Sequence, residues 1–146
     1  MPVDVRTVIE IDCPRDQVSA YAIDPDNAMS WYRNIVEVAW KSPRPVAVGS
    51  QVAFVAKFLG RRLSYTYEVT RLTPGEEFVM GTSEGPFPME TTYAWEDTPG
   101  GGTKMVLRNR GEPKGFSKVV APLMSGAMSR ANRSDLRRLK GILEAG

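Results

Sequence analysis

The second half of the sequence combines short segments of alternating polarity with one long helical segment. Alternating apolar and polar residues define five candidate strands, at residues 51–59, 62–72, 77–84, 87–96 and 103–110. Short runs rich in glycine and proline separate them, so successive strands are expected to lie side by side in an antiparallel meander. In residues 114–144 apolar side chains recur every three or four positions, which is typical of one face of a helix. Together these segments predict a curved sheet wrapped around a long helix, with a pocket between them.

The first fifty residues add two strands and two short helices. Residues 3–11 alternate in polarity and predict a strand at the edge of the sheet. Pro14 and the Asp24-Pro25 pair each suit a helix start, because proline is tolerated in the first helical turn and aspartate is a good N-cap. Residues 34–41 predict the second strand. The expected fold class is therefore α+β, with about seven antiparallel strands, two short helices after the first strand and a long C-terminal helix.

Pro122 lies inside the long helical pattern. Proline removes one backbone hydrogen bond and clashes with the preceding turn. We therefore expect a kink near residues 118–122, which would let the helix follow the concave sheet.

The composition indicates one globular domain spanning residues 1–146. Hydrophobic residues make up 42% of the chain and charged residues 25%, which excludes the composition of a disordered chain. A net charge of +2 gives no reason to expect a nucleic acid as partner. Charges at Asp4, Arg6 and Glu10 do not fit a secretory signal, and no stretch approaches about eighteen consecutive apolar residues. We expect a cytoplasmic protein without stable membrane insertion.

Histidine is absent from the sequence, and Cys13 is its one cysteine. The first fact excludes Ser-His and Cys-His nucleophiles and histidine-ligated metals, and the second excludes an internal disulfide. We therefore predict no metal and no cofactor. Cys13 precedes a helix start, where a thiolate would be favoured, but no base accompanies it. The preferred interpretation is a small, partly buried residue at the bend between a strand and a helix.

Several motifs, in this order along the chain, resemble the START-like superfamily, also called SRPBCC, whose fold is known as the helix-grip. They are residues 13–18, Trp31, residues 48–49, residues 67–70 followed by 74–75, residues 102–103 and residues 135–140. Within the superfamily the chain looks most like the polyketide cyclase/dehydrase-like branch. All of these motifs are architectural. Members of the superfamily include carriers of hydrophobic ligands, aromatase/cyclases, hormone receptors and chaperone-associated domains, so the resemblance implies the fold and no single activity.

Strand alternation predicts which side chains face the pocket. On residues 62–72 the bulky side chains share one face, which we assign to the inside, and the same test places Glu68 and Glu90 outside. The predicted ligand-binding residues are Trp31, Phe54, Phe58, Tyr65, Tyr67, Phe78, Met80, Phe87, Met89, Thr91, Tyr93, Leu107, Asn109, Phe116, Val120 and Met124. The same side chains would also suit a plain hydrophobic core, and the pattern leaves both interpretations open.

An apolar interior with a few hydroxyl and amide groups favours the binding of a small hydrophobic or amphipathic molecule. A second interpretation is a cyclase- or dehydratase-like enzyme acting in the same cavity without metal or histidine. Its candidate catalytic residues are Tyr65, Tyr93 and Asn109, which can hydrogen-bond to a developing enolate. A third is a protein-interaction domain whose cavity is filled by side chains. The sequence is compatible with a monomer and with a homodimer.

Overall fold

The computed structural model describes residues 3–58, 60–85, 88–112 and 120–146, and within these ranges all side chains except those of residues 58 and 120–122. Strand β1 (Val3–Ile11) is followed by the helical segments α1 (Arg15–Ile23), η1 (Pro25–Asn27) and α2 (Ala28–Trp31). The remaining elements are β2 (Ile35–Trp40), β3 (Gln51–Phe58), β4 (Arg61–Thr73), β5 (Glu77–Glu84), β6 (Met89–Asp97), β7 (Thr103–Gly111) and α3 (Val120–Ala145).

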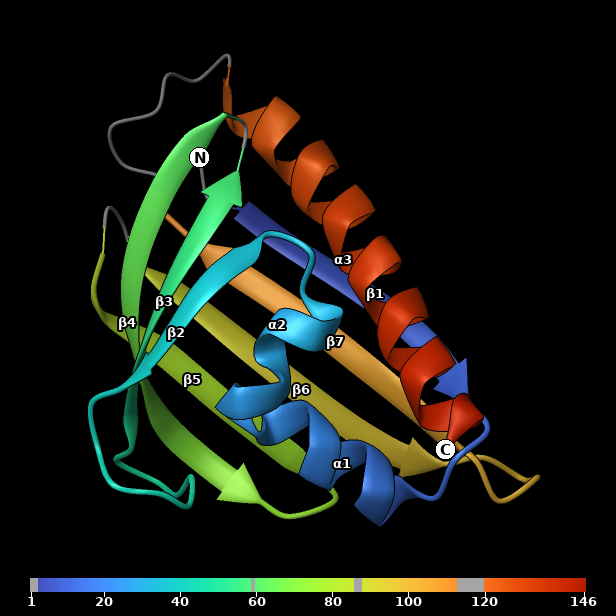
Figure 1. Cartoon of the computed structure of the whole chain (residues 1–146). Coiled ribbons are helices and arrows are strands. Elements are labelled where there is room, and N and C mark those ends of the chain that lie inside the picture. The colour runs from blue at the N-terminus through green and yellow to red at the C-terminus, as the bar shows by residue number, and fades with distance from the viewer. Residues whose placement is uncertain (1–2, 59, 86–87, 113–119) are drawn as a thin grey trace.

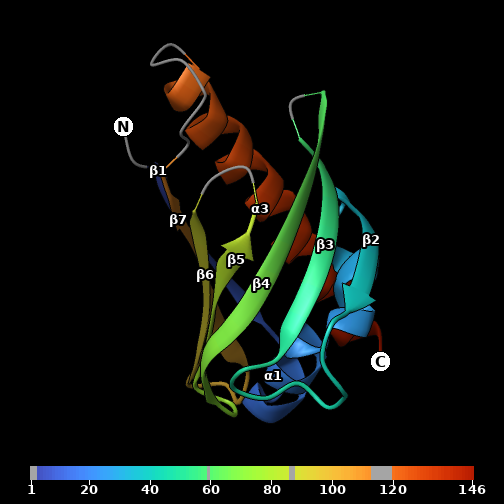
Figure 2. The same cartoon turned by 90° about the vertical axis from the view of Figure 1, so that its left-hand side faces the viewer.

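The strands form one antiparallel sheet in the order β1-β7-β6-β5-β4-β3-β2. The predicted meander is therefore confirmed from β2 to β7, and β1 lies at the edge beside β7, as predicted. The sheet curves strongly, and helix α3 runs along its open side (Figures 1 and 2). The expected α+β class is thus confirmed.

The curvature coincides with irregular pairing and with an anchored turn. The register between β4 and β5 shifts at two places, and such bulges increase the local bend and twist. At the turn between these strands Gly75 has a φ of 76°, which favours glycine. Its N–H donates to Ser19 Oγ at 3.0 Å, and its carbonyl accepts from Arg15 at 3.3 Å. These bonds fix helix α1 against one end of the sheet.

Proline residues lie at or next to the starts of two of the helical segments before β2. The Asp24 carboxylate accepts the N–H of Asp26 at 2.9 Å, and Pro25 is the first residue of η1, so the predicted N-cap and helix start are confirmed. Pro14 lies one residue before α1, with extended backbone, rather than inside the first turn.

Helix α3 packs against β1 and α2. Near its C-terminal end, the Lys140 ammonium donates to the carbonyl of Glu10 at 2.7 Å. The Glu144 carboxylate accepts the N–H of Asp12 at 2.8 Å. This half of the helix is therefore attached to the end of β1 by two hydrogen bonds.

The described part of α3 begins at Val120, which puts Pro122 in its first turn. The region of the expected kink, residues 118–122, lies partly outside the described residues, and the kink stays a prediction. At this end of α3 Leu123 is 66% exposed, although it is apolar, whereas its neighbour Met124 is buried.

The main core cluster lies where α1, α2 and the C-terminal half of α3 meet the sheet. Cys13 belongs to this cluster, and its thiol donates to Gln17 Oε1 at 3.1 Å. Burial, and then the negative charges of Asp12 and Glu144, raise the pKa of the thiol. These surroundings favour the predicted structural role of Cys13 over a reactive one.

Candidate functional site

A cavity lies between the concave face of the sheet, the segment from α1 to β2, and helix α3. About 170 Å³ of it is accessible to the centre of a water molecule. One water needs only about 10 to 15 Å³ by this measure, so the cavity has room for a larger molecule. Most of its wall consists of apolar and aromatic side chains.

Many of the residues predicted to bind a ligand are brought together in this wall. They are Phe54, Tyr65, Tyr67, Phe78, Met80, Met89, Thr91, Tyr93, Asn109 and Met124. Phe87 and Phe116 lie outside the described residues, as do the side chains of Phe58 and Val120. Whether these residues contact a ligand stays a prediction.

The structure places Trp31 and Leu107 in the core rather than in the wall. Both are fully buried and belong to the same cluster as Leu136 and Leu139 of α3. The C-terminal half of the helix fills the concave face at this point, which strand alternation does not reveal. The Trp31 ring instead supports a wall residue from behind, since its centroid lies 5.8 Å from that of Tyr93.

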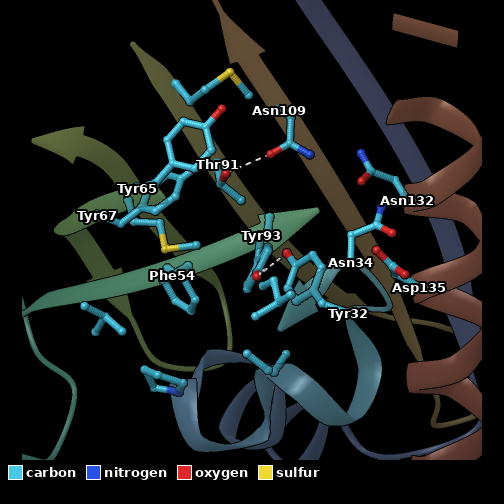
Figure 3. Close-up of a pocket in the computed structure, with 18 of the residues that line it drawn as sticks. Tyr32, Asn34, Phe54, Tyr65, Tyr67, Thr91, Tyr93, Asn109, Asn132 and Asp135 are labelled. Atoms are coloured by element: carbon cyan, nitrogen blue, oxygen red, sulfur yellow. Dashed lines mark hydrogen bonds between the residues drawn. The ribbon is translucent and has the colours of Figure 1, made fainter. Parts of the chain in front are cut away.

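One polar pair in the wall comes from two neighbouring strands. Thr91 on β6 donates from Oγ1 to Asn109 Oδ1 on β7 at 2.7 Å, and both side chains are buried (Figure 3). Burial raises the pKa of the adjacent Tyr67 to about 12, while a hydrogen bond with Thr91 opposes the shift. Tyr67 therefore keeps its proton at neutral pH.

A second polar pair joins the loop after α2 to strand β6. The hydroxyl oxygens of Tyr32 and Tyr93 lie 2.5 Å apart. Burial raises the pKa of both phenols, so both carry their protons at neutral pH. One hydroxyl donates to the other, which leaves one phenolic hydrogen of the pair for another acceptor.

Helix α3 adds Asn132 and Asp135, which lie one turn apart and face the cavity near Asn34 (Figure 3). Asp135 is 3% exposed, and its Oδ1 accepts the backbone N–H of Arg33 at 3.0 Å. Burial raises the pKa of Asp135 to about 6, although the Arg33 hydrogen bond and the charges of Arg138 and Arg33 oppose the shift. A carboxyl group with such a pKa changes its protonation within the physiological range.

The polar residues contributed by α3 and by the loop after α2 were not predicted from the sequence. Asp135 was identified only as part of the motif at residues 135–140. The sequence does contain a signal for Asn132 and Asp135. Both follow Met128 at helical spacing, which puts all three on the face of α3 that lines the cavity. Tyr32 gave no such signal, since it lies between two short elements without periodicity.

The three candidate catalytic residues all line the cavity but are connected to different neighbours. Asn109 bonds to Thr91, and Tyr93 bonds to Tyr32. The Tyr65 ring lies beside Tyr67, with centroids 5.9 Å apart. Among the described residues, Asn109 and Tyr93 are therefore hydrogen-bonded to different side chains.

Glu68 and Glu90 lie on the outer face of the sheet, as the alternation of their strands predicted. Glu68 accepts from Gln51 at 3.0 Å, and Glu90 pairs with Arg110, both away from the cavity wall. Among the described residues no group of three or more Cys, Asp or Glu side chains is arranged to hold a metal ion. Nor does any helix in the described ranges have the length and apolar character needed to cross a membrane.

Comparisons with solved structures show the same fold in several bacterial proteins. A Thermus thermophilus protein superposes with a TM-score of 0.84 at 20% identity, covering 97% of each chain. A START superfamily protein from Mycobacterium smegmatis superposes with 0.83 at 14% identity, again covering 97% of each chain. The Zhui aromatase/cyclase of a Streptomyces species gives 0.82 at 14% identity, covering 99% of this chain and 94% of its own.

A search of curated protein sequences gave no match. Residues 2–144 match the profile of the family described as polyketide cyclase / dehydrase and lipid transport. This match spans nearly the whole sequence and agrees with the START-like neighbours. The chain has the START-like helix-grip fold and belongs to the polyketide cyclase / dehydrase and lipid transport family.

Proposed function

We propose that the protein binds a small hydrophobic or amphipathic molecule in the cavity between the sheet and helix α3. The observation that carries this proposal is an open cavity whose wall is mainly apolar, with a few buried hydrogen-bonding groups. Ligand sites of this type bind by shape and orient the ligand through a small number of polar contacts. The open volume argues against the alternative of a cavity filled by its own side chains.

Two measurements test this proposal. Native mass spectrometry of freshly purified protein, before and after organic extraction, detects a small molecule retained from the cell. Titration with N-phenyl-1-naphthylamine, an uncharged dye that fluoresces in apolar surroundings, measures binding directly. We expect saturable binding of the dye.

A pair of matched variants shows where the dye binds. Ala131 lies in the cavity wall on α3, and Ala145 is exposed at the end of the same helix. Ala131→Phe fills part of the cavity and is expected to weaken dye binding at least about tenfold, whereas Ala145→Phe leaves it unchanged. Equal affinities for both variants would place the dye outside the cavity and contradict the proposal.

A second candidate function is catalysis of a cyclase or dehydratase type, favoured by Asp135. A buried carboxylate with a pKa of about 6 can accept a proton from a carbon beside a ligand carbonyl. The amide of Asn132 and the remaining phenolic hydrogen of the Tyr32 and Tyr93 pair would then hydrogen-bond to the enolate oxygen.

Turnover separates the two candidates. A linear poly-β-ketone thioester is incubated with the protein, and cyclised or dehydrated product is sought by mass spectrometry. Catalysis predicts product formation that rises with pH through about 6 and is lost in Asp135→Asn while dye binding persists. Dye binding without product from any protein sample favours the binding function.

A further inference from the structure

The charged side chains described in the cavity wall are carboxylates. They are those of Asp24 and Asp135, and no Lys or Arg belongs to the wall among the described residues. Arg61 influences Tyr65 from an exposed position at the start of β4. Arg33 and Arg138 act on Asp135 and are also exposed. As far as the described residues go, the cavity wall therefore offers a ligand a negative charge and no cation.

Asn132 supplies an independent sign that a ligand group belongs here. Its side chain is 5% exposed and lines the cavity, yet its Nδ2 has no hydrogen-bond partner among the described residues. Leaving a buried donor unsatisfied is energetically costly, so such a group is normally satisfied by water or by a ligand.

Asn132 and Asp135 together present a donor and an acceptor one helical turn apart. The Asn132 amide nitrogen has hydrogens to donate, and the Asp135 carboxylate has accepting capacity beyond its bond from Arg33. A hydroxyl or carboxamide group matches both, because it can accept from Asn132 and donate to Asp135. A carboxylate or sulfonate could accept from Asn132 but would face Asp135 as a like charge without a donor.

We infer that the cavity selects an uncharged apolar ligand that carries a hydroxyl or carboxamide group, bound between Asn132 and Asp135, and rejects the corresponding anion. This inference rests on the proposed binding function and specifies its ligand class. Fatty acids and other anionic amphiphiles are therefore outside the expected range of ligands.

Two nearly isosteric probes test this selection without any mutation. 2-Naphthamide and 2-naphthoate differ mainly in charge and in the presence of an N–H donor. Their affinities for the wild-type protein are measured at pH 8 by displacement of N-phenyl-1-naphthylamine and by calorimetry. We expect the amide to bind at least about tenfold more tightly, because placing like charges together in a buried site costs several kcal/mol.

Variants then locate the source of the selection. Asp135→Asn replaces the carboxylate by a group that donates, so 2-naphthoate should gain affinity and the ratio should fall to about threefold or less. Asn132→Ala should weaken 2-naphthamide about two- to tenfold. Asp97→Asn makes the same chemical change at an exposed carboxylate paired with Arg15, and it should leave the ratio unchanged.

The outcomes separate the inference from the proposed function. Equal affinities of the two probes for the wild type would overturn the inference, as would dye binding without any affinity for 2-naphthamide, and both would leave the binding function standing. An unchanged ratio in a folded Asp135→Asn protein would also overturn it. Failure of the dye and of both naphthalenes to bind would overturn the proposed function, and the inference with it.

Discussion

The hydroxyl groups of Tyr32 and Tyr93 lie 2.5 Å apart across the cavity wall, although 61 residues separate them in the sequence. The contact joins the loop after α2 to a central strand. Tyr93 is buried and Tyr32 is partly buried, so the contact satisfies a hydroxyl group that lies largely away from solvent. The pair therefore contributes both to the stability of the wall and to its polarity.

Removing one member of this pair should destabilise the protein. Tyr93→Phe leaves the Tyr32 hydroxyl without its partner and should lower the free energy of unfolding by about 1 to 3 kcal/mol, with a similar effect for Tyr32→Phe. The double variant should lose less than the sum of the two single changes. Urea denaturation followed by circular dichroism measures all four proteins, and strictly additive losses would show that the two hydroxyls do not interact.

Asp135→Asn should stabilise the protein at alkaline pH. The pKa of Asp135 is raised from 3.8 to about 6 in the folded state, so the folded protein holds this proton more tightly than the unfolded chain does. That contribution is complete below about pH 4 and is lost as the pH rises through about 6. The asparagine variant, which keeps an acceptor for the Arg33 N–H, avoids this loss and should gain up to about 3 kcal/mol at pH 8.

Denaturation curves from pH 3 to pH 8 provide the measurement. The gain of Asp135→Asn should vanish near pH 3, where the wild-type carboxyl is neutral. A constant difference at all pH values would instead indicate a packing effect unrelated to ionisation.

Glycine replacements in α3 should stabilise the helix. Gly126 and Gly141 are exposed, and an added Cβ would meet no atom within 4 Å at either position. Alanine at each should raise the free energy of unfolding by about 0.5 to 1 kcal/mol. Gly102→Ala is the contrasting variant, because its Cβ would lie 2.7 Å from the carbonyl oxygen of Ile11 and should destabilise the protein. Thermal unfolding distinguishes these outcomes, and a loss of stability in the α3 variants would contradict the prediction.

The Cys13 thiol should react slowly in the folded protein. It is buried, its pKa is raised, and it donates to Gln17, so little thiolate forms at neutral pH. Absorbance with Ellman's reagent should rise slowly in buffer and rapidly in urea. Fast labelling of the native protein would revive the interpretation of Cys13 as a reactive residue.

Local sequence signals predicted the fold because they specify its connections. Turns such as the one at Gly75 make successive strands neighbours, and the Asp24-Pro25 pair marks a helix start without reference to distant residues. The edge position of β1 also followed from its alternation of polar and apolar residues.

The site was less predictable because its polar residues come from separate elements. Alternation identified the face of the sheet that carries Thr91 and Asn109. It does not show where along a strand the cavity ends and the packed core begins, so Leu107 was assigned to the cavity wall although it lies in the core. Asp135 meets Arg33 only after α3 has crossed the open side of the sheet. Nothing local in the sequence specifies that meeting.

The hydrogen bonds of Lys140 and Glu144 to the end of β1 attach the C-terminal half of helix α3 to the sheet. The C-terminal half is held in place by these two hydrogen bonds. The other half covers the cavity and contributes Met124 and Met128 to its wall. Their unbranched side chains can change rotamer without a shift of the backbone. Ligands of different sizes should therefore be accommodated by rearrangement of these two methionine side chains, while the polar groups nearer the C-terminal half of α3 keep their positions.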